Sequence, residues 1–467
     1  MKNILFLIIL TLATLNAADK PNVLIIAVDD LNDWIGVMGG HPQAKTPNID
    51  RLANRGMLFT NAHCQSPVCG PSRGSMMSSL YPSTTGIYFL GPGLKDSPKT
   101  KNHLVMPSRF EDEGYQLSAA GKLCGGRGEN KKYFKEYGGD FGGFGPLPKK
   151  KISSFPGMRL WDWGVYPERE EQTPDAKIAA WGVNKLTQNY EKPFFMGVGF
   201  YRPHVPQFAP QKWFDMYPLE TIQMPKMREA DIADIPQYGI DLTREKHVAP
   251  TYEWALKNNE EKKLVQSYLA CVSFVDAQIG KVLDALDAGP HKENTFVVLY
   301  SDHGFHLGEK ERYAKRSIWE DGTRVPMIIS GPGLKPGVSH KPTQLLDIYP
   351  TLLELTGLKA DSKLEGHSLV ALLRNPQSEW PHYARSSFGP GNYAIISERY
   401  RFIQYNDGSE EFYDHSKDTH EWSNQINNPE YASIIAKHRL QVPRERAPIL
   451  GENWTGHKAY DAAEQNK

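Results

Sequence analysis

Several features that would point to particular classes of protein are scarce in this sequence. The 467 residues carry 54 basic and 54 acidic side chains, so no net charge attracts the chain to nucleic acid or to an anionic membrane. Only four cysteines occur, and their spacing matches no zinc-binding pattern. After residue 18 no apolar run reaches the length of a membrane span, and no internal repeat is visible. We therefore expect neither a nucleic-acid partner nor a membrane-spanning segment in the mature chain.

The N-terminus has the pattern of a secretory signal peptide. Lys2 precedes an apolar run at residues 4–10, and small residues follow at 16–18. We assign residues 1–17 to the signal peptide and expect an exported protein, periplasmic or extracellular. The four cysteines could pair in such a compartment, although a chain of this size does not need a disulfide framework. A free thiol in an exported protein calls for another explanation.

The alternation of apolar runs and helical segments predicts an α/β fold. One helix is expected after Thr46-Pro47, another over residues 72–80, and a third carries an apolar stripe over 264–286 that includes Cys271, which we expect in the core. A mostly parallel sheet flanked by helices follows from this order. The expected strands are residues 21–28, 57–61, 115–120, 194–199, 295–300 and 325–329.

The pattern changes near residues 373–381. Short strands at 393–396, 400–405 and 411–413, with a turn signal at 406–408, predict a small antiparallel sheet, and a helix is expected near 431–440. We therefore divide the mature chain into a catalytic domain, residues 18–375, and a C-terminal subdomain, residues 376–467. Residues 122–163, rich in glycine, proline and lysine, are expected to form a long surface excursion.

Charged side chains follow two of the predicted strands. Asp29 and Asp30 end the first strand, and Asp302 and His303 follow a later one. In parallel sheets such strand ends meet at one edge, so these side chains would converge on a hard cation such as Ca²⁺ or Mg²⁺. Alone, two acids at a strand end are explained more simply by a helix cap or a turn. Two such clusters around a reactive cysteine, Cys69, favour the metal site.

The segment Cys69-Gly70-Pro71-Ser72-Arg73 resembles the Cys-x-Pro-Ser-Arg signature of the type I, formylglycine-dependent sulfatases of the alkaline-phosphatase superfamily. The other matching motifs follow in the order of that family, and the resemblance runs from about residue 21 to the region 410–422. The sequence is most similar to the branch related to iduronate-2-sulfatase. The further matches are Val28-Asp29-Asp30, Gly121-Lys122, Pro203-His204, Ser301-Asp302-His303-Gly304 and Ala314-Lys315.

The resemblance implies a sulfatase in which Cys69 is oxidised to formylglycine (3-oxoalanine). A formylglycine-generating or sulfatase-maturing enzyme would read Cys-x-Pro-x-Arg in the extended chain. The aldehyde hydrates to a geminal diol, and one hydroxyl attacks sulfur and expels the alcohol. Arg73 is then expected to hold a diol oxygen and help neutralise the sulfate, with the positive end of the following helix at the same place.

The resemblance also assigns roles to the remaining motif residues. Lys122 and Lys315 would clamp the sulfate oxygens, and His204 would protonate the leaving alcohol. Without the resemblance, all three would be read as surface residues. One Ca²⁺ would be held by Asp29, Asp30, Asp302, His303 and the modified Cys69.

Two departures from the family pattern stand out. Residues 78–80 read Ser-Ser-Leu where the family has Thr/Ser-Gly-Arg/Lys. The family also carries a histidine shortly after the lysine, thought to take a proton when the sulfated intermediate collapses, and none follows Lys122. His63 or His103 could substitute.

The substrate is only weakly encoded. The export signal, the aromatic residues Trp161 and Trp163, and Arg202 beside Tyr201 suit a sulfated saccharide at the end of a polysaccharide chain, from algae or glycosaminoglycans. Core packing explains the two tryptophans equally well. One alternative is a phosphonate or phosphate-ester hydrolase that uses the same aldehyde. The other, suggested by the missing histidine, is a secreted glycan-binding relative that has lost turnover.

Overall fold

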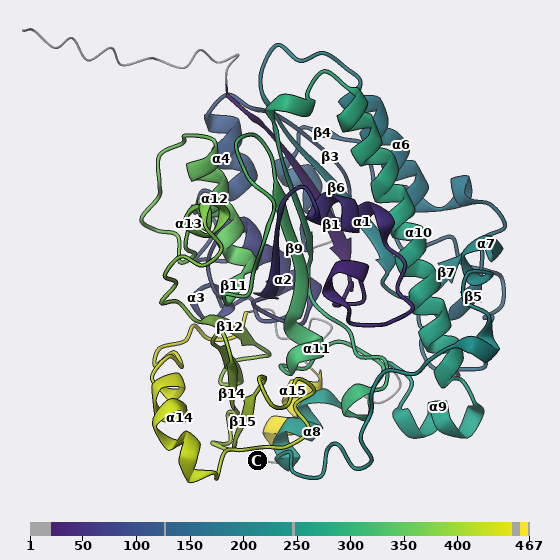
Figure 1. The fold of residues 1–467 in the computed structure, drawn as a ribbon, viewed down its shortest axis with the longest axis vertical. Coiled ribbons are helices and arrows are strands. Elements are labelled where there is room, and N and C mark those ends of the chain that lie inside the picture. Colours follow the sequence, from purple (N-terminus) through teal and green to yellow (C-terminus); the bar gives the residue numbers. More distant parts are fainter. Residues whose placement is uncertain (1–19, 126–127, 245–247, 451–457, 466–467) are drawn as a thin grey trace, which may run out of the picture.

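The central element is a nine-stranded sheet (Figure 1). The protein is described by a computed structural model covering residues 20–125, 128–244, 248–450 and 458–465, so the predicted signal peptide lies outside the described residues. The strand order is β10-β2-β9-β8-β1-β6-β3-β4, with β11 also paired to β2. The strands are β1 (Asn22–Asp29), β2 (Met57–His63), β3 (Gln116–Gly121), β4 (Glu136–Tyr137), β6 (Phe194–Pro203), β8 (Thr295–Ser301), β9 (Arg324–Ser330), β10 (Gly337–Ser339) and β11 (Thr343–Gln344).

The predicted α/β class and mostly parallel sheet are confirmed. β1 pairs parallel with β6 and β8, and β3 pairs parallel with β6 and β4. β9 is the exception, because it runs antiparallel to both β2 and β8. The connection from β8 to β9 therefore starts and ends at the same edge of the sheet. That edge is where the polar strand ends lie.

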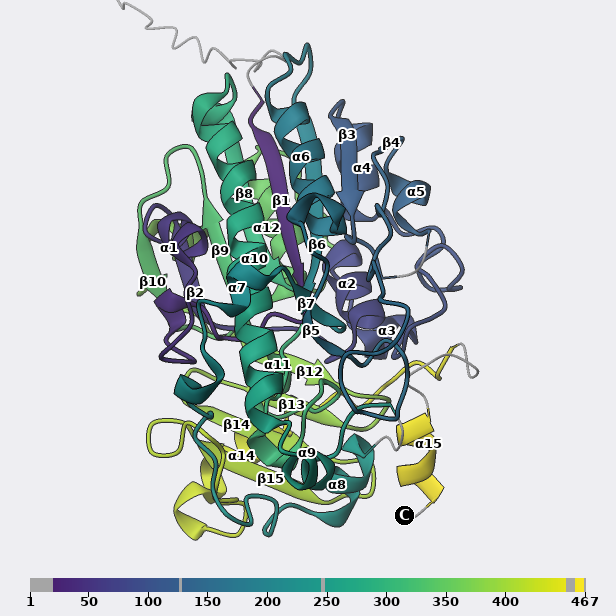
Figure 2. The same cartoon turned by 90° about the vertical axis from the view of Figure 1, so that its right-hand side faces the viewer.

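Helices cover both faces of the sheet (Figures 1 and 2). Side chains of β1 alternate between two apolar clusters: Leu24, Ile26 and Val28 pack toward one face, and Val23 and Ile25 toward the other. The first face is covered by α1 (Pro47–Ala53), α6 (Pro174–Leu186) and the 28-residue α10 (Glu261–Ala288), on which Cys271 is buried as expected. The second is covered by α2 (Cys69–Ser78), α4 (Met106–Asp112), α12 (Ile348–Leu355) and α13 (Val370–Arg374).

A four-stranded antiparallel sheet forms the lower part of the molecule in Figure 1. One of its faces packs on Val68, Ile318 and Trp319 from the large sheet's loops, and the other packs on Tyr431 and Ile435. The predicted small sheet and its helix are therefore present. The elements are β12 (Ala384–Ser387), β13 (Tyr393–Ile396), β14 (Tyr400–Gln404), β15 (Glu410–Asp414), α14 (Ala432–Arg439) and α15 (Lys458–Gln465), which packs on α8 (Gln237–Thr243).

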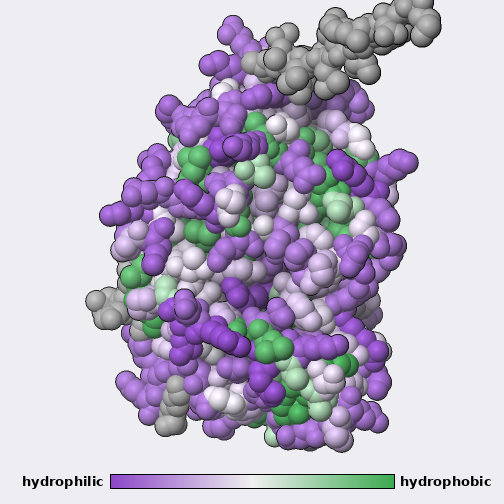
Figure 3. Space-filling model, turned by 90° about the vertical axis from the view of Figure 1, so that its left-hand side faces the viewer, coloured by the Kyte–Doolittle hydropathy of each residue, from purple (hydrophilic) through white to green (hydrophobic). Residues whose placement is uncertain are grey.

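The predicted surface excursion, residues 122–163, contains only short elements in its described part. These are α5 (Asn130–Tyr133), β4 and the start of β5 (Trp163–Val165), which pairs with β7 (Gln207–Ala209). Among the described residues, no helix is long and apolar enough to cross a bilayer. The face in Figure 3 is mostly hydrophilic, with hydrophobic residues in small separate groups.

Candidate active site

The end of β1 is distorted where it delivers the two aspartates. The pairing of β1 with β6 shifts register between Val28 and Asp29, and Asp30 adopts a left-handed backbone conformation with φ 64°. Non-glycine residues rarely occupy this region, and such outliers concentrate at functional sites. The amide of Asp30 donates to Oδ1 of Asp302 at 3.1 Å, which ties the end of β1 to the end of β8.

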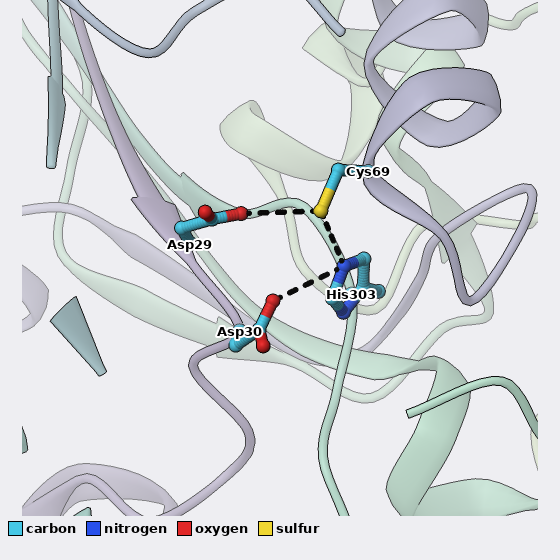
Figure 4. A group of neighbouring side chains, drawn as sticks. All are labelled: Asp29, Asp30, Cys69 and His303. Carbon is cyan, nitrogen blue, oxygen red and sulfur yellow. Dashed lines mark hydrogen bonds and ion pairs between the residues drawn. The ribbon is translucent and has the colours of Figure 1, made fainter. Parts of the chain in front are cut away.

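Cys69 lies at the first residue of α2, facing these strand ends (Figure 4). Its Sγ is 3.4 Å from Oδ1 of Asp29, 3.2 Å from Nε2 of His303 and 3.3 Å from Nζ of Lys315. The helix begins three residues earlier than predicted because Pro71 falls in the first turn, where its missing N–H has no helical partner to lose. The positive end of the helix dipole is therefore at Cys69 itself.

Arg73 holds the three segments around Cys69 together. Its side chain is fully buried, with Nε 2.8 Å from Oδ2 of Asp302 and one terminal nitrogen 3.2 Å from Oδ1 of Asp29. The other terminal nitrogen donates to the carbonyls of Lys122 and Leu123. Arg73 does not line the pocket in the described part of the chain. Its observed contacts are with the two carboxylates and with the backbone of the Lys122 loop.

The residues predicted to bind calcium form a group that fits a cation. One ligand atom from each of Asp29, Asp30, Cys69 and His303 lies within 4.8 Å of the others, and all four residues are buried. Oδ2 of Asp30 is buried without a hydrogen-bond partner among the described residues. An unsatisfied buried carboxylate oxygen is costly unless a cation or donor meets it. Asp302, the fifth predicted ligand, lies beside the group, with its Oδ2 3.6 Å from Nε2 of His303 and 2.8 Å from Nε of Arg73.

The pKa values reflect this concentration of charge. Burial opposes ionisation of Asp29, but Lys122, His204 and Arg73 together hold its pKa well below the usual range. Burial raises the pKa of Asp30, because Lys315 and His303 only partly offset it. Burial also opposes protonation of His303, yet Asp302, Cys69 and Asp30 raise its pKa to about 9. A bound dication would replace that proton as the partner of the carboxylates.

Both predicted sulfate-clamping lysines reach this site. Nζ of Lys122 is 2.6 Å from Oδ2 of Asp29, and Nζ of Lys315 is 2.7 Å from Oδ1 of Asp30. Burial lowers the pKa of both amines, but the facing aspartates and Cys69 outweigh it and raise both pKa values. Both lysines are therefore cationic at neutral pH.

His204 is the third predicted residue at this site. Its Nδ1 is 2.5 Å from the carbonyl oxygen of Val205, and its Nε2 is 3.9 Å from Oδ2 of Asp30. Nδ1 therefore carries the proton that donates to Val205, which leaves Nε2 toward the pocket. Burial, together with Lys315 and Lys122, holds the pKa of His204 well below its ordinary value. The ring also packs on Phe144, with centroids 4.4 Å apart.

A pocket of about 1100 Å³ opens above Cys69. Asp30, Cys69, Lys122, His204 and Lys315 lie in its wall. Its size and mixed lining suit a ligand larger than sulfate alone. Tyr201, named with Arg202 as suited to a saccharide, lines the pocket. Sequence reasoning missed several further lining residues, including Phe144, Arg312 and Arg316, and only the adjacency of Arg316 to Lys315 would have indicated one of them.

The residues predicted to bind substrate separate in the structure. Trp161 lines the pocket and stacks on Phe305 with ring centroids 6.1 Å apart. Trp163 is buried in the core and donates from Nε1 to Glu260 at 2.9 Å. Arg202 is 2% exposed and donates from Nε to the carbonyl of Phe208 at 2.9 Å. In the described part of the chain, neither Trp163 nor Arg202 lines the pocket.

Close packing excludes a side chain at Gly125, one of the positions shortly after Lys122. A Cβ at Gly125 would lie 2.6 Å from the Cα of Gly70 in α2, so this loop has no room for a side chain there. Cys124 lines the pocket, but burial raises the pKa of its thiol far above neutral pH.

The two histidines considered as substitutes point elsewhere. Nε2 of His63 is 2.7 Å from Oδ1 of Asn61, and burial lowers the pKa of its ring to about 3. Nε2 of His103 is 2.7 Å from the carbonyl oxygen of Ser78. Among the described residues lining the pocket, His204 is the one histidine.

Ser79 takes the place of the glycine expected after α2. It caps the helix in the left-handed conformation with φ 53°, which glycine would adopt without strain. Its Oγ donates to the carbonyl of Leu346 at 2.8 Å and accepts from the amide of Gly366 at 3.1 Å. These two hydrogen bonds offset the backbone strain and anchor the end of the helix that starts at Cys69.

The fold and site together define an α/β enzyme of the alkaline-phosphatase type, with a lysine-lined pocket over a buried cluster of Asp29, Asp30, Cys69 and His303. The comparisons agree. A family model described as "Sulfatase" matches residues 21–358, and one described as "N-sulphoglucosamine sulphohydrolase, C-terminal" matches residues 308–447. The chain belongs to the sulfatase family and is a sulfuric ester hydrolase.

Individual relatives cover most of the chain. A sulfatase from Formosa agariphila is 43% identical over 445 residues, which is 92% of this chain and 87% of that protein. Iduronate 2-sulfatase from Mus musculus is 30% identical over 338 residues, which is 68% of this chain and 60% of that protein. A solved structure of a 2-O GAG sulfatase superposes with a TM-score of 0.70 at 25% identity, covering 90% of each chain. The predicted resemblance to the iduronate-2-sulfatase branch is thus confirmed.

Proposed function

We propose that this protein is an exported sulfatase that removes sulfate from a sulfated saccharide, with a formylglycine made from Cys69 as nucleophile. The observation that carries the proposal is the position of Cys69: at the start of α2, at the base of the pocket, within 3.4 Å of Asp29, His303 and Lys315. A saccharide substrate is supported by the pocket's volume, by Trp161 in its wall, and by the likeness to a 2-O GAG sulfatase.

Calcium is the proposed metal. Asp29, Asp30, Asp302 and His303 would hold it, together with the modified residue 69, because carboxylate oxygens dominate the donor set. When bound, a dication increases the acidity of the attacking hydroxyl and draws negative charge from the sulfate. Arg73 contributes by fixing two of these carboxylates and the backbone after Lys122.

The remaining residues act on the sulfate ester itself. Lys122 and Lys315 bind the sulfate oxygens and orient sulfur toward residue 69. His204 donates a proton from Nε2 to the oxygen of the leaving alcohol, while its Nδ1–H stays bonded to Val205. The two lysines lower the pKa of His204 in the free enzyme, and a bound sulfate offsets their charge and favours the protonated ring. After this transfer the ring is neutral, so His204 can also accept the proton released later in the cycle.

The test is sulfate release across a panel of defined sulfated oligosaccharides, by enzyme whose formylglycine content is measured by mass spectrometry. We expect modified wild type to release sulfate, and Cys69→Ala to release none while keeping its circular dichroism spectrum. Undiminished sulfate release by Cys69→Ala would contradict the proposal. Faster turnover of matched phosphonate or phosphate esters than of every sulfate ester would instead favour the phosphonate or phosphate-ester hydrolase. Binding without release, with Cys69 intact, would indicate a glycan-binding relative.

A further inference from the structure

A second group of metal-ligand side chains lies on the segment that connects β8 to β9, outside the site described above. It consists of His306, Glu309 and Asp321. His306 and Glu309 belong to residues 302–319, here called the β8–α11 loop, and Asp321 belongs to α11 (Glu320–Thr323). One ligand atom from each residue lies within 4.8 Å of the other two.

His306 presents an unsatisfied nitrogen to the two acids. The residue is fully buried, and its Nε2 is 2.5 Å from Oγ of Ser317. Its Nδ1 is buried without a hydrogen-bond partner among the described residues and lies 3.8 Å from Oδ2 of Asp321. In the tautomer whose Nε2–H donates to Ser317, the lone pair of Nδ1 faces Asp321, an arrangement that a cation would stabilise. Burial, with Arg312 and Lys310, lowers the pKa of His306.

The basic side chains near His306, Glu309 and Asp321 are paired with other groups. Nζ of Lys310 is 2.9 Å from Oδ1 of Asp231 and also donates to the carbonyl of Glu421. Arg324 pairs with Asp33 and Glu320. Arg312 donates to the carbonyls of Thr243 and Lys315.

Glu309 and Asp321 therefore lack a compensating basic partner. In the part of the chain that the structure describes, neither forms an ion pair with lysine or arginine. Burial raises the pKa of Glu309 to about 7, with Asp33 and Asp231 adding to the effect. Partial burial, then Glu309 and Asp33, raises the pKa of Asp321, whose side chain is 30% exposed.

We propose that His306, Glu309 and Asp321 form a second metal site, for a divalent ion that accepts mixed nitrogen and oxygen ligands, such as Zn²⁺. Three ligands, one of them an imidazole, suit such an ion better than they suit calcium, which takes about six to eight ligands that are mostly oxygens. Ser317 would orient the imidazole, as hydrogen-bonded groups behind metal-binding histidines do.

The ion would join the β8–α11 loop to α11 close to the catalytic lysine. The amide of His306 donates to the carbonyl of Ala314 at 3.0 Å, directly before Lys315. The amide of Gly304 likewise donates to the carbonyl of Gly322, beside Asp321. Fixing His306 to Asp321 would therefore hold the backbone that presents Lys315 to the sulfate.

The test uses full-length protein with excess Ca²⁺, to which Zn²⁺ is added before extensive dialysis against calcium buffer. Zinc per chain is then measured by mass spectrometry. We expect wild type to retain about one zinc, and Glu309→Gln and Asp321→Asn each to bind it at least tenfold more weakly. Unchanged urea unfolding in EDTA would show that both variants fold.

Two control variants address other zinc ligands in the chain. His382→Gln disrupts the stacked pair His367 and His382, whose ring centroids are 3.6 Å apart, and Cys69→Ser removes the thiol of the catalytic cluster. Both should retain zinc. Wild type should also show slower hydrogen exchange over residues 304–317 when zinc is added. The proposal is overturned if wild type retains no zinc, if both acid variants retain it, or if either control variant loses it. None of these readouts depends on sulfatase activity.

Discussion

Replacing Arg73 by methionine tests whether this side chain compensates the carboxylates that calcium is proposed to bind. The variant Arg73→Met keeps much of the buried volume but removes a charge that contacts Asp29, Asp302 and two backbone carbonyls. Breaking a buried ion pair by removing one partner costs about 3–5 kcal/mol. Lys122 and His303 remain beside the two aspartates, so we expect a loss of about 4 kcal/mol in the metal-free protein, against a typical total of about 5–15 kcal/mol.

Calcium should recover part of this loss. A ligand at one hundred times its dissociation constant stabilises the folded state by about 2.7 kcal/mol. Without Arg73 the site is more negative by one unit, so at equal free calcium the variant should gain more than wild type. The assay is urea unfolding with EGTA and with excess Ca²⁺, on proteins that both carry unmodified Cys69. The deficit of the variant should shrink when calcium is added.

A matched control exists in the C-terminal sheet. Arg401 is also fully buried, where it pairs with Glu320 and, at 2.7 Å, with Oε1 of Glu421. We expect Arg401→Met to lose a similar free energy of unfolding, but with a deficit that calcium does not reduce. The reasoning is refuted if Arg73→Met loses less than about 1 kcal/mol, or if its deficit is the same with and without calcium.

Three further predictions concern the pocket residues, the neighbouring core and the end of α2. The pKa of His204 in the free enzyme lies below its usual value, so kcat/KM for sulfate release should fall about tenfold per pH unit above that pKa. The variant His204→Gln should lose this pH dependence. A flat wild-type profile between pH 6 and 8 would contradict the role of His204 as the acid. Trp161→Ala should raise KM for the saccharide about tenfold, or about 1.4 kcal/mol. Trp163→Ala should lower the free energy of unfolding by about 3–5 kcal/mol with little change in KM. Equal effects on KM would refute the assignment of Trp161 to the pocket and Trp163 to the core. Ser79→Ala should lose about 2–4 kcal/mol of unfolding free energy in urea, because the Leu346 carbonyl and the Gly366 amide lose a partner. Ser79→Gly should lose about 1 kcal/mol less, because glycine avoids the left-handed strain. Wild-type stability in Ser79→Ala would contradict the contribution of these two hydrogen bonds.

The sequence predicted most of the large sheet because its strands are buried on both faces. β1, β6 and β8 are continuous apolar runs, and such runs identify buried strands without any knowledge of their neighbours. The antiparallel direction of β9 was not predicted, because it depends on where the β8–α11 loop returns. Periodicity within one strand carries no information about that path.

The rule that strand ends meet at one edge of a sheet predicts a cluster of side chains there. The cluster consists of Asp29, Asp30, Cys69 and His303. The place of Arg73 behind the carboxylates was not predictable, because it depends on the depth at which α2 packs. Trp161 and Trp163 show the same limit: they are two positions apart, yet one faces the pocket and the other the core. The short strand β5 begins at Trp163, and nothing in the local sequence fixes its register.

The burial of Cys69 has a consequence for the timing of maturation. Only 4% of the residue is exposed in the folded chain, and its backbone is already wound into the first turn of α2. An enzyme that must read this segment in extended form has access only until the sheet and helix have assembled. If Cys69 is oxidised to formylglycine as proposed, folding and oxidation compete for the same nascent chain, and a molecule that folds first keeps its thiol. The specific activity of a preparation then depends on the relative rates of folding and oxidation, and not on the stability of the folded protein.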